Sequence, residues 1–229
     1  WAWGYNNYGQ LGTSNTTNYY SPVQIGNSLW SQVACGYANI LAIQSNGTLW
    51  SCGYNNNGQL GQNSITNLSS PVQVGTALNW SDAKAGVSWT LGLQTTGGIF
   101  AWGINSNGTL GQSDVVSRSS PVQLGTGTSF TSIGAASHGV AISGTSLYAW
   151  GYNAAGQLGT NDILSRSSLV QVGTYSITQI DAGLNNTAFI LNTGALYMWG
   201  LNTAYNLATG DTVARSSPIQ IGASSYVSI

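Results

Sequence analysis

One ten-residue motif, present five times at a nearly constant spacing, constrains this chain more than any other feature of its sequence. The copies are WGYNNYGQLG at 3, CGYNNNGQLG at 52, WGINSNGTLG at 102, WGYNAAGQLG at 150 and WGLNTAYNLA at 199. Successive copies begin 49, 50, 48 and 49 residues apart. A fixed period of this length indicates a building unit that is repeated along the chain.

The rest of the sequence keeps the same period. All four prolines occupy one position of an S-P-V/I-Q motif, where the fourth repeat has Leu169; they are Pro22, Pro71, Pro121 and Pro218. Each repeat contains four short apolar segments separated by Gly, Asn, Ser and Thr turns, and none has helical periodicity. Because proline cannot donate a ladder hydrogen bond, its segment is expected at a sheet edge or at a strand start.

Four strands in about 49 residues predict the blade of a β-propeller. We therefore expect an all-β fold of four-stranded blades, with residues 1–229 forming a single propeller array. Its repeats are anchored at Trp3, Cys52, Trp102, Trp150 and Trp199, where Cys52 replaces the usual tryptophan. The glycines after these anchors are also predicted to be structural: Gly4, Gly53, Gly103, Gly151 and Gly200.

The segments LYAWGYNAAGQLGTND, SSLVQVG, ITQIDAG and LNTGALYMWG resemble the repeat of the regulator of chromosome condensation family. That resemblance implies a β-propeller, most often seven-bladed. Kelch repeats have a similar period, but their double glycine occurs here only at Gly97 and Gly98. Residues 1–196 make four periods and 197–229 about two thirds of a fifth, so we expect an excerpt of a seven-bladed ring, with a five-bladed ring as the alternative.

Composition excludes several classes of function. Charged residues make up 4% of the chain, and its four cations, Lys84, Arg118, Arg166 and Arg215, are spread along its length. Nucleic-acid binding needs a clustered basic surface, so none is expected. No apolar run approaches the roughly 18 residues that span a bilayer, which predicts no membrane insertion. A chain rich in Asn, Ser and Thr and poor in charge favours an extracellular, cell-surface or virion location.

Catalytic and metal sites are not expected either. The chain has one histidine, His138, two cysteines and no glutamate, which is too little for a nucleophilic triad or a zinc site. The loop aspartates lack the alternating carboxylates of a calcium loop. We therefore predict no enzyme activity, no cofactor and no metal, and we expect a structural role for His138.

Six of the nine charged residues follow the repeat as Asp-x-x-x-Arg pairs: Asp114 with Arg118, Asp162 with Arg166, and Asp211 with Arg215. We interpret each pair as a brace within its loop, and the alternative is a charged rim that docks a partner. Cys35 and Cys52 could form a disulfide, but we favour two buried thiols.

Candidate recognition residues are the loop tyrosines. The tyrosines that directly follow Trp-Gly or Cys-Gly, Tyr5, Tyr54 and Tyr152, are predicted to pack within their blades. Four others have no counterpart at the same repeat position and are the candidate partner-binding residues: Tyr8, Tyr19, Tyr20 and Tyr205. Tyrosine and asparagine bind partners at low ordering cost.

The family resemblance also bears on function. Its founding member is a nuclear exchange factor that binds chromatin and a small GTPase through a charged face, and this chain lacks such charges. We therefore predict a non-enzymatic interaction or structural scaffold that binds a protein partner through propeller loops. The alternative is a carbohydrate-binding surface module that recognises a surface glycan, and a guanine-nucleotide exchange factor is the less favoured third reading.

Overall fold

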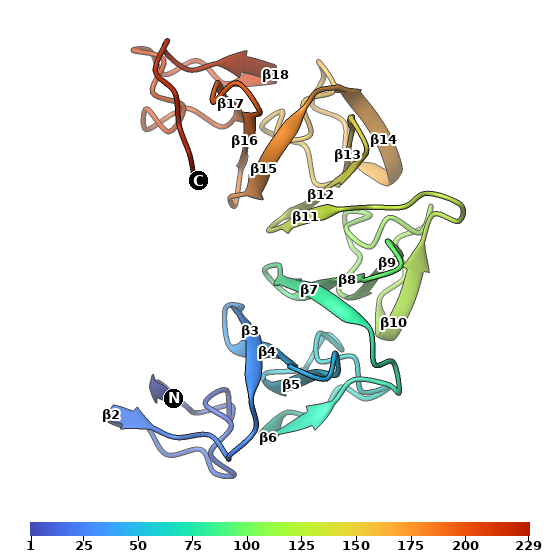
Figure 1. Cartoon of the computed structure of the whole chain (residues 1–229), viewed down its shortest axis with the longest axis vertical. Coiled ribbons are helices and arrows are strands. Elements are labelled where there is room, and N and C mark those ends of the chain that lie inside the picture. The colour runs from blue at the N-terminus through green and yellow to red at the C-terminus, as the bar shows by residue number, and fades with distance from the viewer. The chain divides into compact units, whose positions relative to one another are not determined.

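The computed structural model describes all 229 residues, and its strands form five antiparallel sheets (Figure 1). The chain divides into two compact units, one of Trp1–Asn105 with Val116–Leu124 and one of Ser106–Val115 with Gly125–Ile229. The segment 106–115 belongs to the second unit because it packs on the fourth repeat. A Cβ atom on Gly108 would lie 2.4 Å from the Cα atom of Ser167.

The first unit contains three sheets. The first is a two-stranded sheet, and two four-stranded sheets follow in the orders β3-β4-β5-β6 and β7-β8-β9-β10. The strands are β1 (Ala2–Gly4), β2 (Tyr19–Val23), β3 (Trp30–Cys35), β4 (Asn39–Gln44), β5 (Leu49–Gly53), β6 (Leu68–Gln73), β7 (Trp80–Ala85), β8 (Trp89–Gln94), β9 (Ile99–Gly103) and β10 (Arg118–Leu124).

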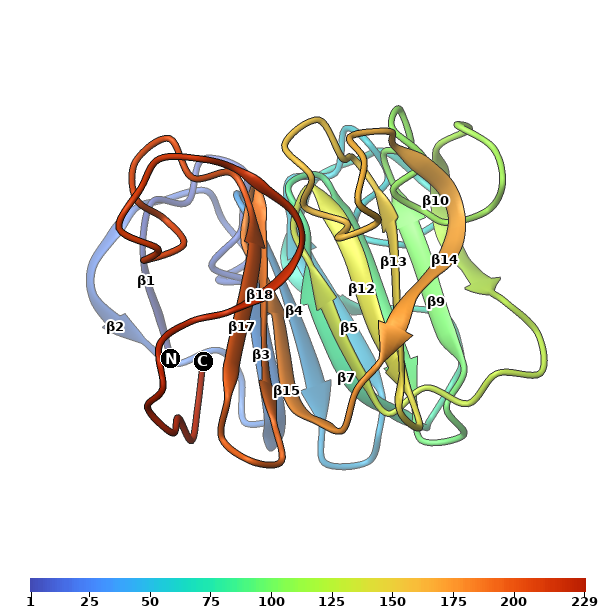
Figure 2. The ribbon, with the colours of Figure 1, turned by 90° about the horizontal axis from the view of Figure 1, so that it is seen from above.

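The second unit contains two four-stranded sheets, in the orders β11-β12-β13-β14 and β15-β16-β17-β18. Figure 2 shows the long loops after β13 and β17 at one end of these sheets. The strands are β11 (Ser132–Ala135), β12 (His138–Ser143), β13 (Ser146–Gly151), β14 (Arg166–Thr174), β15 (Ile177–Ala182), β16 (Asn186–Leu191), β17 (Leu196–Gly200) and β18 (Arg215–Gln220).

The four strands expected in each repeat are confirmed in the four complete sheets. Their prolines lie in the outermost strand, as expected for a residue that cannot donate to a ladder. Pro71, for example, lies in β6, which pairs only with β5, between the pairs Gly53–Leu68 and Ser51–Val72, where the register shifts. Proline is therefore accommodated at an edge and beside a bulge.

Neighbouring sheets of a unit pack face to face. In the first unit β7 contacts β3 and β4, and in the second unit β15 contacts β11 and β12. The apolar layer between β3–β6 and β7–β10 includes Leu41, Ile43, Leu49, Trp80 and Trp102. Each sheet thus buries one face against its neighbour, which is how repeat arrays build a core.

Candidate functional site

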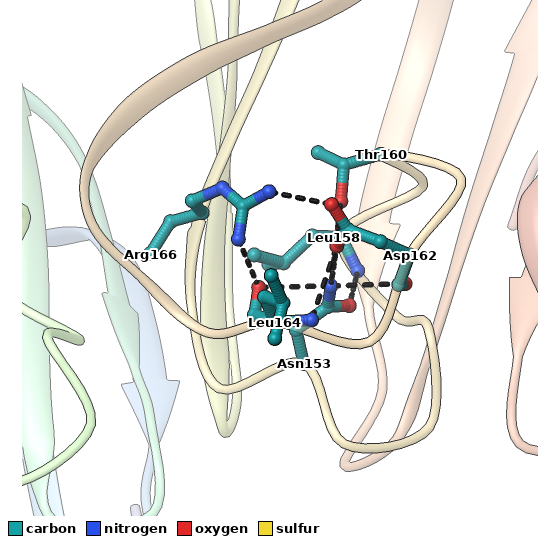
Figure 3. A network of polar contacts seen from close by, with 6 residues as sticks. All are labelled: Asn153, Leu158, Thr160, Asp162, Leu164 and Arg166. Atoms are coloured by element: carbon teal, nitrogen blue, oxygen red, sulfur yellow. Dashed lines mark hydrogen bonds and ion pairs between the residues drawn. The ribbon is translucent and has the colours of Figure 1, made fainter.

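A buried asparagine in each long loop organises the loop that follows the third strand of a sheet. In the fourth repeat, Asn153 is the centre of the polar network in Figure 3. Its Nδ2 donates to the Asp162 carbonyl oxygen (3.2 Å) and the Leu164 carbonyl oxygen (3.1 Å), and its Oδ1 accepts from the Leu158 N–H (2.8 Å). Asn6, Asn55, Asn105 and Asn202 are equally buried. The sequence signal for this role is the asparagine itself, which is present in all five copies of the motif.

The Asp-x-x-x-Arg pairs lie in the same loops. Arg166 Nη2 donates to Asp162 Oδ2 at 2.5 Å, and Arg166 Nη1 donates to the Leu164 carbonyl oxygen at 2.8 Å. Burial acts to raise the pKa of Asp162, but hydrogen bonds from Leu164, Thr160 and Arg166 outweigh it and lower that pKa. The pair braces its own loop, in agreement with the sequence interpretation.

The fifth repeat repeats this arrangement. Arg215 Nη2 donates to Asp211 Oδ2 at 2.7 Å. The pKa of Asp211 is lowered, first by the hydrogen bond from the Val213 N–H and then by that from Arg215. Both carboxylates are already neutralised locally, so they leave little field to attract a charged partner.

The Gly-Gln-Leu-Gly turn of one repeat receives the tryptophan of the next. The indole N–H of Trp199 donates to the Gln157 carbonyl oxygen at 2.8 Å, and the Thr187 hydroxyl donates to the same oxygen at 2.7 Å. The indole of Trp102 bonds to Gln59 at 2.9 Å and that of Trp150 to Thr109 at 2.8 Å. The tryptophan and the turn of the motif thus form a contact between neighbouring repeats.

His138 lies behind this contact in the second unit. Its Nε2 is 2.7 Å from Thr187 Oγ1. Since the Thr187 hydroxyl proton is donated to Gln157, Nε2 carries the imidazole proton and donates to Thr187. Complete burial lowers the pKa of His138 to about 3, so the ring is neutral. The expected structural role of His138 agrees with this placement.

An aromatic loop cluster forms on the first unit from Tyr5, Tyr8, Tyr37 and Tyr54. The ring of Tyr8 makes edge contacts with Tyr5 (centroids 6.2 Å apart) and Tyr54 (4.9 Å). A cavity of about 320 Å³ beside it is lined by Tyr8, Tyr37, Ala38, Tyr54, Asn57, Val87 and Ser88. Tyr37, which the sequence analysis did not single out, is 88% exposed. Its signal is an aromatic ring where the next repeat has Val87.

The other candidate tyrosines lie in different settings. Tyr19 is half-buried, and its hydroxyl accepts a hydrogen bond from Asn15 Nδ2 at 3.0 Å within its own loop. Tyr20 is 97% exposed on the edge strand β2. Tyr205 lies in the second unit, in the turn of the fifth repeat, and is exposed. Of the four candidates, only Tyr8 lies in the aromatic loop cluster.

Two packing expectations need correction. Tyr5 was expected to pack within its blade, but it is exposed and contacts Tyr8 at the surface. Cys35 was expected to be buried, but it is exposed, because every second residue of β3 is exposed. Cys35 and Cys52 are both free thiols. Each pairs with Ile40, from opposite sides of β4, so two strand spacings of about 4.8 Å separate them, too far for a disulfide.

No group of three or more His, Cys, Asp or Glu side chains lies close enough together to hold a metal ion. The chain has no helix with the length and apolarity needed to span a bilayer.

Comparison with known families identifies the repeat. The model of the regulator of chromosome condensation (RCC1) repeat matches residues 1–43, 46–93 and 96–142, which together make up more than half of the chain. The chain belongs to the RCC1 repeat family. A second RCC1 repeat model matches residues 30–59 and 177–205, so the fourth-to-fifth repeat region is included.

Several solved structures share the fold. Human WBSCR16 is 23% identical with a TM-score of 0.83, and the match covers 96% of this chain and 62% of that one. Yeast RCC1 (Prp20), solved with Kap60 bound, is 18% identical with a TM-score of 0.81, covering 93% of this chain and 54% of that one. Saccharomyces cerevisiae Prp20p, described with its binding to Gsp1p and histones, is 18% identical with a TM-score of 0.78, covering 96% and 56%. This chain therefore spans less than two thirds of each of these three chains.

Proposed function

We propose that this RCC1-repeat protein is a non-enzymatic scaffold that binds a protein partner through its loops, with the aromatic loop cluster as the contact on the first unit. The observation that carries the proposal is the cavity of about 320 Å³ beside that cluster, with Tyr37 exposed at its edge. Aromatic side chains are enriched among the residues that anchor protein interfaces.

The surrounding loops favour a protein over a glycan. Exposed aliphatic side chains occur in the loop after the third strand of every four-stranded sheet and in the loops after β7 and β15. In the first unit they are Ile65, Val87 and Val116, and in the second unit Val115, Ile163, Leu164, Leu184 and Val213. Aliphatic groups exposed repeatedly on one set of loops mark protein-binding surfaces more than polar sugar sites.

Charge supports the same choice. No residue that lines the cavity beside the aromatic loop cluster is charged, and in the second unit two of the Asp-x-x-x-Arg pairs neutralise each other within their loops. A surface without a net field does not steer a highly charged partner. We therefore propose an interface whose affinity changes little with salt, unlike the charged face that a guanine-nucleotide exchange factor uses. The fold itself is compatible with protein binding, since Prp20 has been solved with Kap60 bound.

We propose the location of the protein from its composition. A chain with 4% charged residues and many neutral polar side chains fits an extracellular, cell-surface or virion protein. The seven-bladed ring that the family resemblance implies likewise stays a prediction.

The test compares a loop variant with a matched surface variant. Quantitative capture from the native source uses three baits: the unaltered protein, Tyr37→Ala, and Tyr20→Ala as the control at an equally exposed tyrosine. We expect one protein to be lost at least about 10-fold with Tyr37→Ala and retained with Tyr20→Ala, as for a hot spot worth about 1.4 kcal/mol or more. Direct binding of that purified protein at 0.1 and 0.5 M NaCl then checks the expected weak salt dependence.

Three outcomes contradict the proposal. Retention of every captured protein by Tyr37→Ala removes the aromatic loop cluster from the interface. Saturable binding on a glycan array that is lost in Tyr37→Ala or Tyr20→Ala supports the carbohydrate alternative instead. Accelerated nucleotide release from a small GTPase would show an exchange activity.

A further inference from the structure

The cavity beside the aromatic loop cluster is walled by loops of three successive repeats in the first unit. Tyr8 comes from the turn of the first repeat, Tyr54 and Asn57 come from that of the second, and Tyr37 and Val87 come from the loops after β3 and β7. None of the lining residues lies in a strand. The cavity therefore offers a ligand the side chains of loops, and it has no free strand edge to which a partner could add a β-strand.

The aromatic rings of the cavity stand at an angle to one another. The Tyr8 and Tyr54 rings meet edge-on, with centroids 4.9 Å apart and an interplanar angle of 63°, so together they form a corner. Tyr37 lines the cavity from a different loop and is exposed. Rings in this arrangement leave apolar surface on which a second set of compact apolar groups can pack.

The polar side chains of the cavity have donors that the protein does not use. The hydroxyls of Tyr8, Tyr37 and Tyr54 make no hydrogen bond within the protein, and neither does the side-chain amide of Asn57. Each of these groups can donate to a carbonyl oxygen. Because no lining residue is charged, the matching ligand is neutral, partly apolar and rich in free carbonyl oxygens.

We propose that this cavity binds an extended, proline-rich segment of a partner protein in the polyproline II conformation. That conformation has no internal hydrogen bonds, so its carbonyl oxygens are free to accept from the tyrosine hydroxyls and the Asn57 amide. Proline has no N–H, so it leaves no buried donor without a partner. Its rings pack on the tyrosine rings, which is how aromatic-lined grooves recognise this conformation. The inference rests on the proposed function, because it names the class of partner segment that the aromatic loop cluster binds.

A helical segment fits the same cavity less well. Within a helix the carbonyl oxygens accept from the N–H groups of the next turn, so they do not pair with the donors of the cavity. Covering Tyr37 and Asn57 with such a segment would leave these donors desolvated and without partners, which costs binding free energy. The unused donors therefore favour an extended segment over a helix.

The probe is a ten-residue polyproline peptide with an acetylated and an amidated end. It is titrated into the unaltered protein and followed by two-dimensional NMR of carbon-13-labelled tyrosine rings. We expect saturable shifts at Tyr8, Tyr37 and Tyr54, with a Kd of about 1 mM or below. A Gly-Ser peptide of the same length and with the same end groups is flexible and should bind at least about 10-fold more weakly, since it must be ordered on binding. The polyproline affinity should be equal at 0.1 and 0.5 M NaCl, because the lining has no charge.

Variants at exposed positions locate the site without disturbing the fold. Tyr37→Ala should weaken polyproline binding at least about 10-fold, and Tyr37→Phe, which removes only the hydroxyl, about 5-fold. Val87→Asp places a charge at the wall formed by the third repeat and should also weaken binding at least about 10-fold. Tyr20→Ala is the control at an equally exposed tyrosine outside the cavity, and it should bind as the unaltered protein does.

Three results would overturn the inference: no saturable binding of polyproline, equal affinity for the two peptides, or unchanged affinity in both Tyr37→Ala and Val87→Asp. The proposed function is tested separately. A native partner that depends on Tyr37, found together with no polyproline binding, would overturn this inference and leave the proposed function standing. Saturable polyproline binding at Tyr37 with no partner lost in Tyr37→Ala would do the reverse.

Discussion

The turns of the fourth and fifth repeats, both in the second unit, have the same backbone conformation but different residues. Gly156 and Gly159 have φ angles of 80° and 74°, and their counterparts Tyr205 and Ala208 have φ angles of 58° and 54°. The fourth turn is covered by the fifth repeat. A Cβ atom on Gly156 would lie 2.7 Å from Ser216 Cα, and one on Gly159 would lie 2.8 Å from Trp199 Nε1. Tyr205, by contrast, is 63% exposed.

This difference distinguishes two reasons why a turn position can require glycine: the left-handed backbone conformation and the close approach of the next repeat. Non-glycine residues reach the left-handed region at a cost of about 1 kcal/mol, and the fifth turn has two such residues. Turn conformation alone therefore does not require glycine. What requires it in the fourth turn is the close approach of the next repeat, for which a side chain leaves no space.

The strongest test exchanges residues between these two turns. Gly156→Tyr should lower the free energy of unfolding by about 3 kcal/mol or more, because the new side chain meets the backbone of Ser216. Tyr205→Gly should change it by no more than about 1 kcal/mol, since only local strain is relieved. Urea unfolding followed by tryptophan fluorescence measures both.

Gly210→Ala is the control for strain without contact. Gly210 has a φ angle of 77°, and a Cβ atom at this position would have no neighbour within 4 Å. Its substitution should cost about 1 kcal/mol. If Gly156→Tyr costs no more stability than Gly210→Ala, the close approach of the fifth repeat is not what requires glycine in the fourth turn.

The next prediction concerns the contact behind the fourth turn. The pKa of His138 is about 3 in the folded protein, below the ordinary histidine value of 6.5, so the unfolded chain binds one more proton between these values. The stability that the buried neutral His138 contributes is therefore fully present above pH 6.5. It falls as the pH decreases toward 3, by up to about 1.4 kcal/mol per pH unit. His138→Asn should remove this slope, as measured by urea midpoints at pH 8, 6 and 5. An unchanged slope in the variant would exclude His138 as its source, because this is the only histidine in the chain.

The smallest effect should be the same in both repeats. Arg166→Ala and Arg215→Ala each remove a partly exposed ion pair within a loop. We expect equal losses of stability, smaller than the two effects above and reduced in 1 M NaCl. Because both aspartate pKa values are lowered from 3.8, the losses should be complete at neutral pH and should disappear only as the pH falls below 3.8 and through the lowered pKa of each carboxyl. Unequal losses would mean that the contact of a turn with the next repeat also changes the strength of the Asp–Arg ion pair in its loop.

The sequence predicted the repeat, the four strands and the edge prolines, because these follow from local alternation and period. It did not predict the buried role of Asn153, since a polar residue in a Gly-rich turn looks like a surface residue until its acceptors are known. Tyr5 and Tyr37 were misjudged or missed for a related reason. Tyr37 lines the cavity with Tyr8 and Tyr54, which come from other loops, and the exposure of Tyr5 depends on how its loop lies on the surface, so no local pattern indicates either. Tyr8 was singled out from the sequence as irregular, whereas its neighbours in the cluster were not, and its role in binding stays a prediction.

The contact between repeats has a direction, since each repeat inserts an indole on one side and presents a turn on the other. An interface of this head-to-tail kind has no built-in limit, and copies of a chain that expose both halves can stack into fibres. In the fifth turn, the side chains of Tyr205 and Ala208 stand where the fourth turn leaves space for Ser216 and Trp199. A repeat with serine and tryptophan at those positions does not fit there in the usual way. Any repeat that covers the fifth turn must therefore leave room for the side chains of Tyr205 and Ala208, so this contact differs from the one between the fourth and fifth repeats.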